Sequence, residues 1–295
     1  MGTRAWWRNG VIYQVYPRSF QDSNGDGIGD LRGITERADY FSWLGVDAVW
    51  SSPFFTSPMA DFGYDIANFT DIDPSYGSLA EFDEMVGALH ARGIRVILDF
   101  VPNHSSDRHP WFLQSLRSRR SKKRGWYIWR CPSPGAGPPN NWQSMAGGSS
   151  WEFDGTTGQY YCHTFLKQQP DLNWRNGAVR EAMYDVLRFW LARSVDGFRI
   201  DAVGCLAKDE QFRDDPPNPD YHEGDPPFAR NRMVMSANGP HIHAIIAGIR
   251  RVVDAGARES VLIGEVYLKP GELAPYYGAT AVSYTHLRAH ETGRN

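Results

Sequence analysis

The chain has 295 residues, of which 41% are hydrophobic and 22% are charged, as in a folded globular protein. Its formal net charge of −3 argues against a nucleic-acid-binding surface, and the basic run 117–124 is short enough to be a solvated helix end or loop. No segment has the ~20 consecutive apolar residues of a membrane helix, and the N-terminus lacks the apolar stretch of a signal peptide. The three cysteines match no zinc or disulfide pattern, so free thiols and a cytoplasmic location are expected.

Apolar β-prone strands and amphipathic helices alternate along the chain. Strands are expected at 11–16, 46–51, 94–101, 197–203 and 261–266. Helices are expected around the apolar repeats at 34–44, 82–89, 179–191 and 242–253. Gly45 and Gly93 stand where helices should end, and Ser78 with Glu81 forms a capping box. This alternation predicts an α/β fold with a parallel sheet.

Two architectures fit such a sheet: a (β/α)8 (TIM) barrel and an open doubly wound sheet. No Gly-x-Gly-x-x-Gly motif follows an early strand, which leaves a dinucleotide-binding sheet without support. Asp99, Asp201 and Glu265 all stand at or near the C-terminal ends of strands, where barrel enzymes place their chemistry. We therefore expect a (β/α)8 barrel, truncated after about five strands.

The composition divides the chain into four segments. Residues 1–104 and 177–281 carry the alternating elements and are expected to form the barrel. Residues 105–176 are rich in Gly, Pro, Trp and Asn, which predicts an irregular insertion domain after the third strand. Residues 282–295 show no helix or strand period and are interpreted as a non-native tail. An incomplete barrel exposes sheet edges, so this polypeptide is expected to fold poorly on its own.

Side-chain alternation along the strand at 197–203 places Arg199 and Asp201 on one face. A cation lowers the pKa of a neighbouring carboxylate, so Arg199 would keep Asp201 ionised, as a nucleophile must be. Glu265 ends a buried strand, where partial desolvation suits a carboxyl group that holds a proton. Two such groups about 5–5.5 Å apart are the apparatus of a retaining glycosidase. Taken alone, an Arg–Asp pair on one strand is more often a structural ion pair, so the functional interpretation depends on the whole set of residues.

Three segments resemble signature regions of the α-amylase superfamily, in the order found there: Asp99-Phe-Val-Pro-Asn-His104, Gly197-Phe-Arg-Ile-Asp201 and Gly264-Glu265-Val-Tyr267. A fourth, Gln169-Pro-Asp-Leu-Asn-Trp174, is similar to a signature of its α-glucosidase and oligo-1,6-glucosidase branch. The resemblance covers residues 6–278. It implies a retaining, exo-acting α-glucosidase whose substrates are maltose-like oligosaccharides or other α-glucosides.

The resemblance also implies a role for each candidate residue. Asp201 is the nucleophile, Glu265 is the general acid/base, and Arg199 is the partner of the nucleophile. Five side chains are expected around the bound glucosyl residue: Asp61, Tyr64, His104, Phe165 and Gln169. Of these, the first would bind sugar hydroxyl groups and the second would stack on the sugar ring. In this branch Ala202, directly after the nucleophile, goes with α-1,4 rather than α-1,6 linkages.

The loop from Asp22 to Asp30 spaces oxygen donors for a hard cation. It is not an EF-hand, because Gly33 stands at the twelfth position, where a bidentate Glu is required. The loop resembles a cation site of bacterial α-glucosidases, which implies five ligands: Asp22, Asn24, Asp26, the carbonyl group of Ile28, and Asp30. A structural Ca²⁺ is favoured, while Mg²⁺ and a metal-free turn stay open.

The family's later His-Asp motif, whose Asp completes the catalytic trio, does not follow in these 295 residues. We therefore expect this polypeptide to hydrolyse little on its own. Two alternative functions stay open: glucosyl transfer or sugar isomerisation through the same covalent intermediate, and a non-catalytic interaction module. The presence of Asp201, Glu265 and Arg199 disfavours the interaction module.

Overall fold

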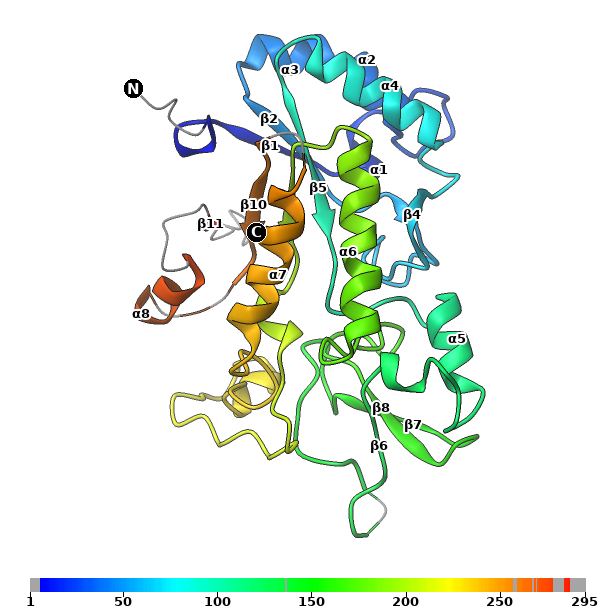
Figure 1. Cartoon of the computed structure of the whole chain (residues 1–295), viewed down its shortest axis with the longest axis vertical. Helices are drawn as coiled ribbons and strands as arrows, with labels where there is room; N and C mark the ends of the chain where they lie inside the picture. The colour runs from blue at the N-terminus through cyan, green and yellow to red at the C-terminus, as the bar shows by residue number, and fades with distance from the viewer. Residues whose placement is uncertain are drawn as a thin grey trace.

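The computed structural model describes residues 6–135, 137–256, 259–266, 268, 270–277 and 284–286. Its central feature is a parallel sheet in the order β1-β2-β5-β9-β10-β11 (Figure 1). The strands are β1 (Ile12–Val15), β2 (Ala48–Ser51), β5 (Arg95–Phe100), β9 (Gly197–Ile200), β10 (Val261–Gly264) and β11 (Tyr284–His286). Every neighbouring pair in this sheet is parallel. The sheet is the partial (β/α)8 barrel that the alternating pattern predicts.

The sequence analysis missed one strand and misjudged the ends of others. Residues 284–286 lie in the segment 282–295, in which no strand was expected, but they form β11 and pair with β10. The interpretation of this segment as a non-native tail stays a prediction. The other residues of 282–295 lie outside the described part of the chain. The strand expected at 197–203 ends at Ile200, because Ala202 has a left-handed backbone conformation with φ of 45°.

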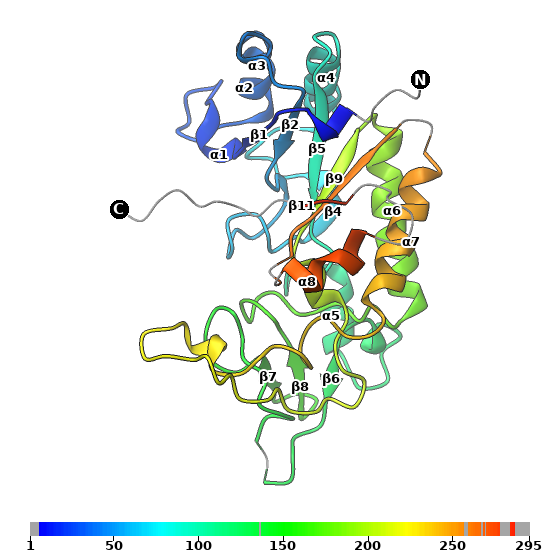
Figure 2. The same ribbon diagram turned by 90° about the vertical axis from the view of Figure 1, so that its left-hand side faces the viewer.

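Helices connect the parallel strands. They are α1 (Pro17–Phe20), α2 (Leu31–Glu36), α3 (Ala38–Leu44), α4 (Leu79–His90), α5 (Pro110–Leu116), α6 (Gly177–Ala192), α7 (Ile242–Asp254) and α8 (Pro270–Leu273). Figure 2 shows α6 and α7 side by side along one face of the sheet. In the described part of the chain, no helix combines the length and the apolar character needed to cross a membrane.

Local signals explain where several helices begin and end. The Ser78 side chain accepts from the backbone N–H of Glu81 at the start of α4, as the capping box predicts. Asp30 caps α2 in the same way, accepting from Gly33 N–H at 2.6 Å. The helix expected at 34–44 is instead two helices, since α2 ends before Arg37 and α3 begins after it.

Strand alternation divides the apolar residues between the two faces of the sheet. Leu98, Phe100 and Phe198 belong to a large cluster with the helices, whereas Ile97 and Ile263 belong to a second cluster with the Trp50 ring. The second cluster is the barrel interior. Polar residues that continue the interior face, beyond these apolar layers, therefore meet at the C-terminal ends of the strands.

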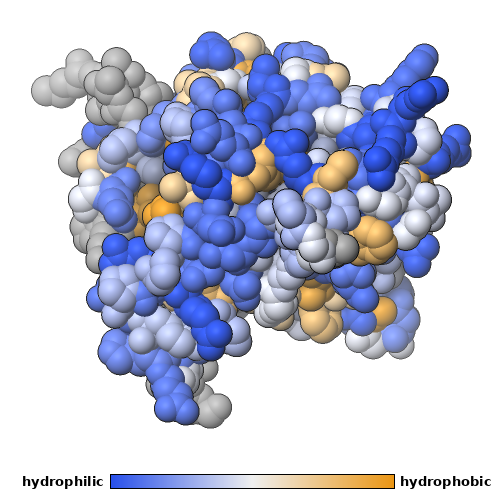
Figure 3. All heavy atoms as spheres, turned by 90° about the horizontal axis from the view of Figure 1, so that it is seen from below, coloured by the Kyte–Doolittle hydropathy of each residue, from blue (hydrophilic) through white to orange (hydrophobic). Residues whose placement is uncertain are grey.

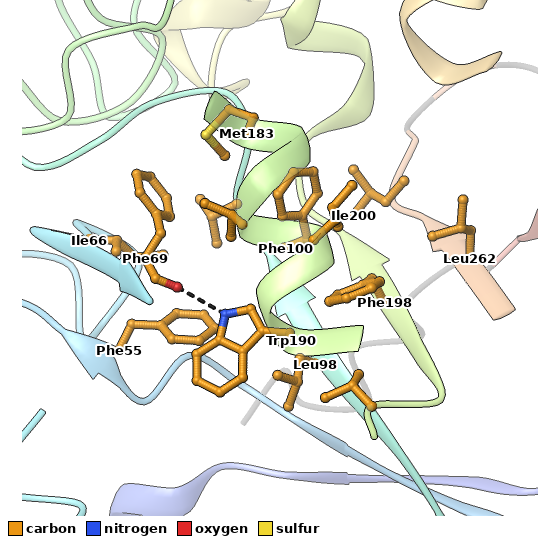
Figure 4. Packing of buried hydrophobic residues seen from close by; sticks show 14 of the residues in the cluster. Phe55, Ile66, Phe69, Leu98, Phe100, Met183, Trp190, Phe198, Ile200 and Leu262 are labelled. Carbon is orange, nitrogen blue, oxygen red and sulfur yellow. Dashed lines mark hydrogen bonds between the residues drawn. The ribbon is translucent and has the colours of Figure 1, made fainter. Parts of the chain in front are cut away.

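Trp190 anchors α6 to the rest of the large cluster (Figure 4). The side chain is 1% exposed, its ring centroid lies 4.9 Å from that of Phe82, and its indole N–H donates to the Phe69 carbonyl oxygen at 2.9 Å. Aromatic contacts and one buried hydrogen bond thus hold α6 above the sheet.

Residues 105–176 carry a small antiparallel sheet with the order β6-β8-β7. Its strands are β6 (Trp129–Arg130), β7 (Trp151–Asp154) and β8 (Gln159–Cys162). Outside this segment, β3 (Phe55–Thr56) and β4 (Asn68–Ile72) form a separate antiparallel pair. In Figure 1 the small sheet lies beyond the end towards which the β5 arrow points. Figure 3 shows this end of the molecule as mostly hydrophilic, with scattered hydrophobic spots.

Candidate active site

The ends of three neighbouring strands bring the predicted catalytic groups together. Asp99 lies in β5 and pairs in register with Arg199 of β9, which in turn is in register with Ile263 of β10. Asp201 directly follows β9, and Glu265 directly follows β10. The C-terminal ends of parallel strands meet at one edge of the sheet, so residues far apart in sequence face one site.

Arg199 lies at the centre of this site. Its Nη1 donates to Asp99 Oδ1 at 2.8 Å and to Asp201 Oδ1 at 2.6 Å, and its Nη2 lies 2.8 Å from Glu265 Oε2. The guanidinium side chain is 10% exposed, so these contacts are shielded from water. One cation therefore holds both predicted catalytic carboxylates, Asp201 and Glu265, in one cluster.

Arg199 lowers the pKa of Asp201, as predicted, but this influence does not decide the net direction of the shift. Burial raises the pKa of Asp201 well above its usual value, Arg199 lowers it, and the charges of Glu265 and Asp99 raise it. Burial likewise raises the pKa of Asp99 to about 6, against the influence of Arg199. Because three carboxylates share one cation, the cluster retains protons at a pH where isolated carboxylates are ionised.

The turn after β9 is strained and depends on Glu265. Ala202 has φ of 45°, a conformation that is uncommon for a residue with a Cβ atom. Its backbone N–H donates to Glu265 Oε2 at 3.1 Å, and the N–H of Val203 donates to the Glu265 carbonyl oxygen at 3.2 Å. Strain of this kind is typical of functional sites, and here it fixes the nucleophile candidate relative to Glu265.

The residues predicted around the sugar form a connected polar cluster beside the carboxylates. The Tyr64 hydroxyl group donates to Asp99 Oδ2 at 3.2 Å. Gln169 Nε2 donates to Asp61 Oδ2 at 2.8 Å and lies 3.0 Å from Nε2 of His104. The structure thus links Tyr64 to Asp99, the third carboxylate that contacts Arg199, and joins Asp61, His104 and Gln169 to each other.

Phe165 completes this set, because its ring meets the His104 ring edge-on with the centroids 5.3 Å apart. Burial lowers the pKa of His104 to about 4, so the imidazole is neutral near pH 7. Burial raises the pKa of Asp61, whose side chain also faces the charge of Asp65. The site therefore combines aromatic edges with neutral and acidic hydrogen-bonding groups, which suits a sugar.

Comparison with known proteins identifies the family. The family description "Alpha amylase, catalytic domain" matches residues 14–288, which is most of the chain. The chain belongs to the α-amylase family. The match extends beyond residue 281, where the sequence analysis ended the native chain, whereas Tyr267 of the third signature lies outside the described residues.

The relatives of this α-amylase family chain are α-glucosidases and similar enzymes. It is 55% identical over 213 residues to the "Probable alpha-glucosidase" of Rhizobium meliloti (strain 1021), covering 72% of the chain and 39% of that relative. It is 44% identical over 274 residues to the "Oligo-1,6-glucosidase" of Heyndrickxia coagulans, covering 92% of the chain and 48% of that relative. The crystal structure of the "alpha-glucosyl transfer enzyme, XgtA" superposes with a TM-score of 0.92 at 43% identity, covering 96% of the chain and 54% of that structure. The chain thus spans about half the length of the relatives it matches.

Two residues that the sequence analysis did not place in the site are Asp65 and Asp171. Asp65 is fully buried and accepts from the Ser57 hydroxyl group and the N–H groups of Ala60 and Asp61, which fixes the loop carrying Asp61. Asp171 is also fully buried, within the Gln169–Trp174 signature. The available signal for Asp171 was that it is the single ionisable residue of that signature.

The loop 22–30 has the oxygen-only donor set that a hard cation prefers, with Asp22 at its centre. Asp22 accepts from the backbone N–H of Gly27 at 2.8 Å and from that of Gly25 at 2.7 Å, and these hydrogen bonds lower the pKa of Asp22. Asp30 is used differently, since it caps α2 and also accepts from the Ser23 hydroxyl group. Within the described part of the chain, no group of three or more His, Cys, Asp or Glu side chains is gathered as a metal site would need. The donor types fit a cation, while the arrangement of the carboxylates does not by itself form a site.

Phe212 joins the long loop after β9 to residues of the 105–176 segment. Its ring centroid lies 5.4 Å from that of Trp142, and the Arg130 guanidinium lies 3.6 Å from the Phe212 centroid. The Trp142 indole N–H donates to the Arg213 carbonyl oxygen, and Asn141 Nδ2 donates to the Asp215 carbonyl oxygen, both at 2.9 Å. The loop beside the catalytic strands is therefore packed against this segment.

Proposed function

We propose that this chain carries the nucleophile and the general acid/base of a retaining α-glucosidase. Asp201 would attack the anomeric carbon of an α-glucosyl residue while Glu265 protonates the departing glycosidic oxygen. Glu265 would then accept a proton from water, whose oxygen displaces Asp201 and releases glucose. The observation that carries this proposal is the single buried Arg199 bonded to both carboxylates.

The proton-retaining carboxylate cluster suits this chemistry. A retaining glycosidase requires one ionised and one protonated carboxyl group in the same pocket. Arg199 lowers the pKa of Asp201 and so favours its ionised form, whereas burial and the neighbouring carboxylates favour retention of a proton within the cluster. The mechanism requires this proton to be on Glu265 when the substrate binds. Asp61 and Gln169 supply hydrogen-bonding groups for sugar hydroxyls, and Tyr64 supplies a ring. We infer from Ala202 that α-1,4 linkages of maltose-like substrates are preferred over α-1,6 linkages.

Trapping of the covalent intermediate tests the proposal on the chain itself. The chain would be incubated with 5-fluoro-α-glucosyl fluoride, which requires only one turnover, and the labelled peptide would be identified by mass spectrometry. We expect one label on Asp201, its loss in Asp201→Asn, and its retention in Glu265→Gln, because fluoride leaves without a proton donor. A label on another residue, or no label under any condition, would contradict the proposal.

A second candidate is transfer of the glucosyl group to a sugar instead of water. It is favoured by the likeness to XgtA, which is described as an alpha-glucosyl transfer enzyme. Both reactions share the covalent intermediate and differ in the acceptor. Product analysis from maltose separates them: glucose alone indicates hydrolysis, whereas longer oligosaccharides indicate transfer.

We further infer that the loop 22–30 binds a structural Ca²⁺, because its oxygen donors and Gly-rich turns are those a hard cation requires. Asp22, Asn24, Asp26, Ile28 and Asp30 would hold the ion, which would stiffen the segment between α1 and α2. Bound ion stabilises the native state by mass action. The calcium proposal is independent of the catalytic one.

We infer a cytoplasmic location from the cysteines. Cys131, Cys162 and Cys205 are free thiols in the structure, and free thiols are typical of reducing compartments. Cell fractionation with an antibody to the chain tests this, and recovery in a secreted fraction would contradict it.

A further inference from the structure

A buried ion pair lies where three segments of the chain meet, outside the catalytic cluster. Lys208 Nζ is 3.0 Å from Asp171 Oδ2, and the two side chains are 4% and 0% exposed. Lys208 also donates to the Cys205 carbonyl oxygen at 2.6 Å. The proposed mechanism uses neither charged group, yet removing two charges from water costs desolvation free energy. We therefore looked for a function of this ion pair in its contacts with neighbouring side chains.

The pair fixes the orientation of a third residue, Asn103. Its Nδ2 donates to Asp171 Oδ1 at 2.8 Å, and its Oδ1 faces Lys208 Nζ at 3.4 Å. A carboxylate only accepts hydrogen bonds and an ammonium group only donates them. The side-chain amide of Asn103 is therefore held with its oxygen towards Lys208 and its nitrogen towards Asp171.

The same Asn103 nitrogen faces the imidazole of His104, with Nδ2 3.2 Å from Nδ1. Since Nδ2 is a donor, Nδ1 of His104 must accept, which leaves the proton of the neutral ring on Nε2. The other side of the ring does not decide the tautomer. Nε2 lies 3.2 Å from the Tyr64 carbonyl oxygen, an acceptor, and 3.0 Å from Gln169 Nε2, a donor, so it is satisfied with or without a proton.

We propose that the Lys208–Asp171 ion pair sets the tautomer of His104 by fixing the amide of Asn103, so that Nε2 carries an N–H group that faces the Tyr64 carbonyl oxygen. Lys208 and Asp171 are positioning residues that act through Asn103. Only the last step, the contact of His104 with a glucosyl hydroxyl group, rests on the proposed function. The tautomer itself is a property of the folded chain.

Nitrogen NMR of the histidine rings tests this without catalysis. The full chain would be labelled with ¹⁵N-histidine, and His104 would be assigned among the nine histidines by the signal lost in His104→Gln. The double variant Asp171→Leu/Lys208→Met removes both charges together, so no lone charge is left buried. We expect the wild-type ring to carry its proton on Nε2. In the double variant the Nδ1–H form should rise from undetectable to about a tenth of the molecules or more, as the loss of one hydrogen-bond constraint allows.

Two further variants make the outcome decisive. Asp196→Asn is the matched control, because this buried carboxylate contacts His90 at 2.6 Å at the other end of the strands and should leave the His104 tautomer unchanged. Asn103→Ala removes the amide itself and should shift the tautomer in the same direction, also where the double variant fails to fold. An unchanged Nε2–H population in the folded double variant, or in Asn103→Ala, would overturn the inference. If the variants shift the tautomer but Asp201 of the wild-type chain is not labelled, the result would count against the proposed function and not against this inference.

Discussion

Replacing Asp99 by Asn should stabilise the chain at neutral pH, although it removes a partner of Arg199. Burial raises the pKa of Asp99 from 3.8 to about 6, because the hydrogen bonds from Arg199 and Tyr64 offset only part of the desolvation. In Asp99→Asn the side-chain oxygen still accepts from Arg199, and the new N–H₂ group can donate to the Tyr64 hydroxyl oxygen. The variant therefore keeps the contacts and loses the buried charge.

The sign and the size follow from proton linkage. Folded Asp99 holds its proton up to about pH 6 and unfolded Asp99 only to about pH 4, so wild-type stability from this group falls as pH rises between the two values. A shift of about two pKa units at 1.36 kcal/mol per unit corresponds to about 3 kcal/mol. The free energy of unfolding of Asp99→Asn, relative to wild type, should therefore increase by about 3 kcal/mol between about pH 4 and pH 7.

Urea unfolding followed by tryptophan fluorescence at several pH values measures this difference. Asp39→Asn is the control, because Asp39 is exposed and the hydrogen bond from Arg92 lowers its pKa. Its loss should act in the opposite direction, weakening the native state above the pKa of the unfolded carboxyl group. A difference for Asp99→Asn that is constant with pH, or that favours wild type at neutral pH, would refute the reasoning.

Three further outcomes are expected. Trp190→Phe removes the indole N–H that donates to the Phe69 carbonyl oxygen. The free energy of unfolding, measured in urea, should therefore fall by about 2–3 kcal/mol. A loss below about 1 kcal/mol would show that the indole does not anchor α6. Gly197→Ala places a Cβ 2.4 Å from the Val261 carbonyl oxygen, so unfolding should become easier by about 2 kcal/mol or more and Asp201 labelling should weaken; wild-type values in both assays would mean that β9 and β10 adjust freely. Chelation of Ca²⁺ should lower the Tm of wild type but not of Asp22→Asn, and equal Tm values with and without chelator in wild type would contradict the calcium proposal.

The fold was predictable where local patterns decide it. The apolar strand at 94–101 appears as β5, and the Ser78 capping box starts α4, because alternation and capping depend on a few neighbouring residues. The early end of β9 was not predictable, since the left-handed Ala202 depends on a hydrogen bond to Glu265, 63 positions away. The pairing of 284–286 with β10 is likewise a tertiary contact without a local pattern.

The contact between Arg199 and Asp201 was predictable from the sequence, but the electrostatics of the site were not. Strand alternation correctly placed Arg199 and Asp201 next to each other, and the contact at 2.6 Å follows from it. The net rise in the pKa of Asp201 could not be read from the sequence, because it depends on burial and on how many carboxylates the fold brings to one guanidinium. The Lys208–Asp171 pair joins different segments, and neither residue signals the other in sequence.

The packing of Phe212 against Trp142 has a consequence for engineering. If the loop after β9 is exchanged between relatives, the Phe212 ring is exchanged with it, and this ring packs against Trp142 and Trp151 of the 105–176 segment. A grafted loop without an aromatic side chain at this position would leave Trp142 and Trp151 without their packing partner. A side chain of different shape would not pack against them. A chimeric protein should therefore take the loop after β9 and the 105–176 segment from the same parent.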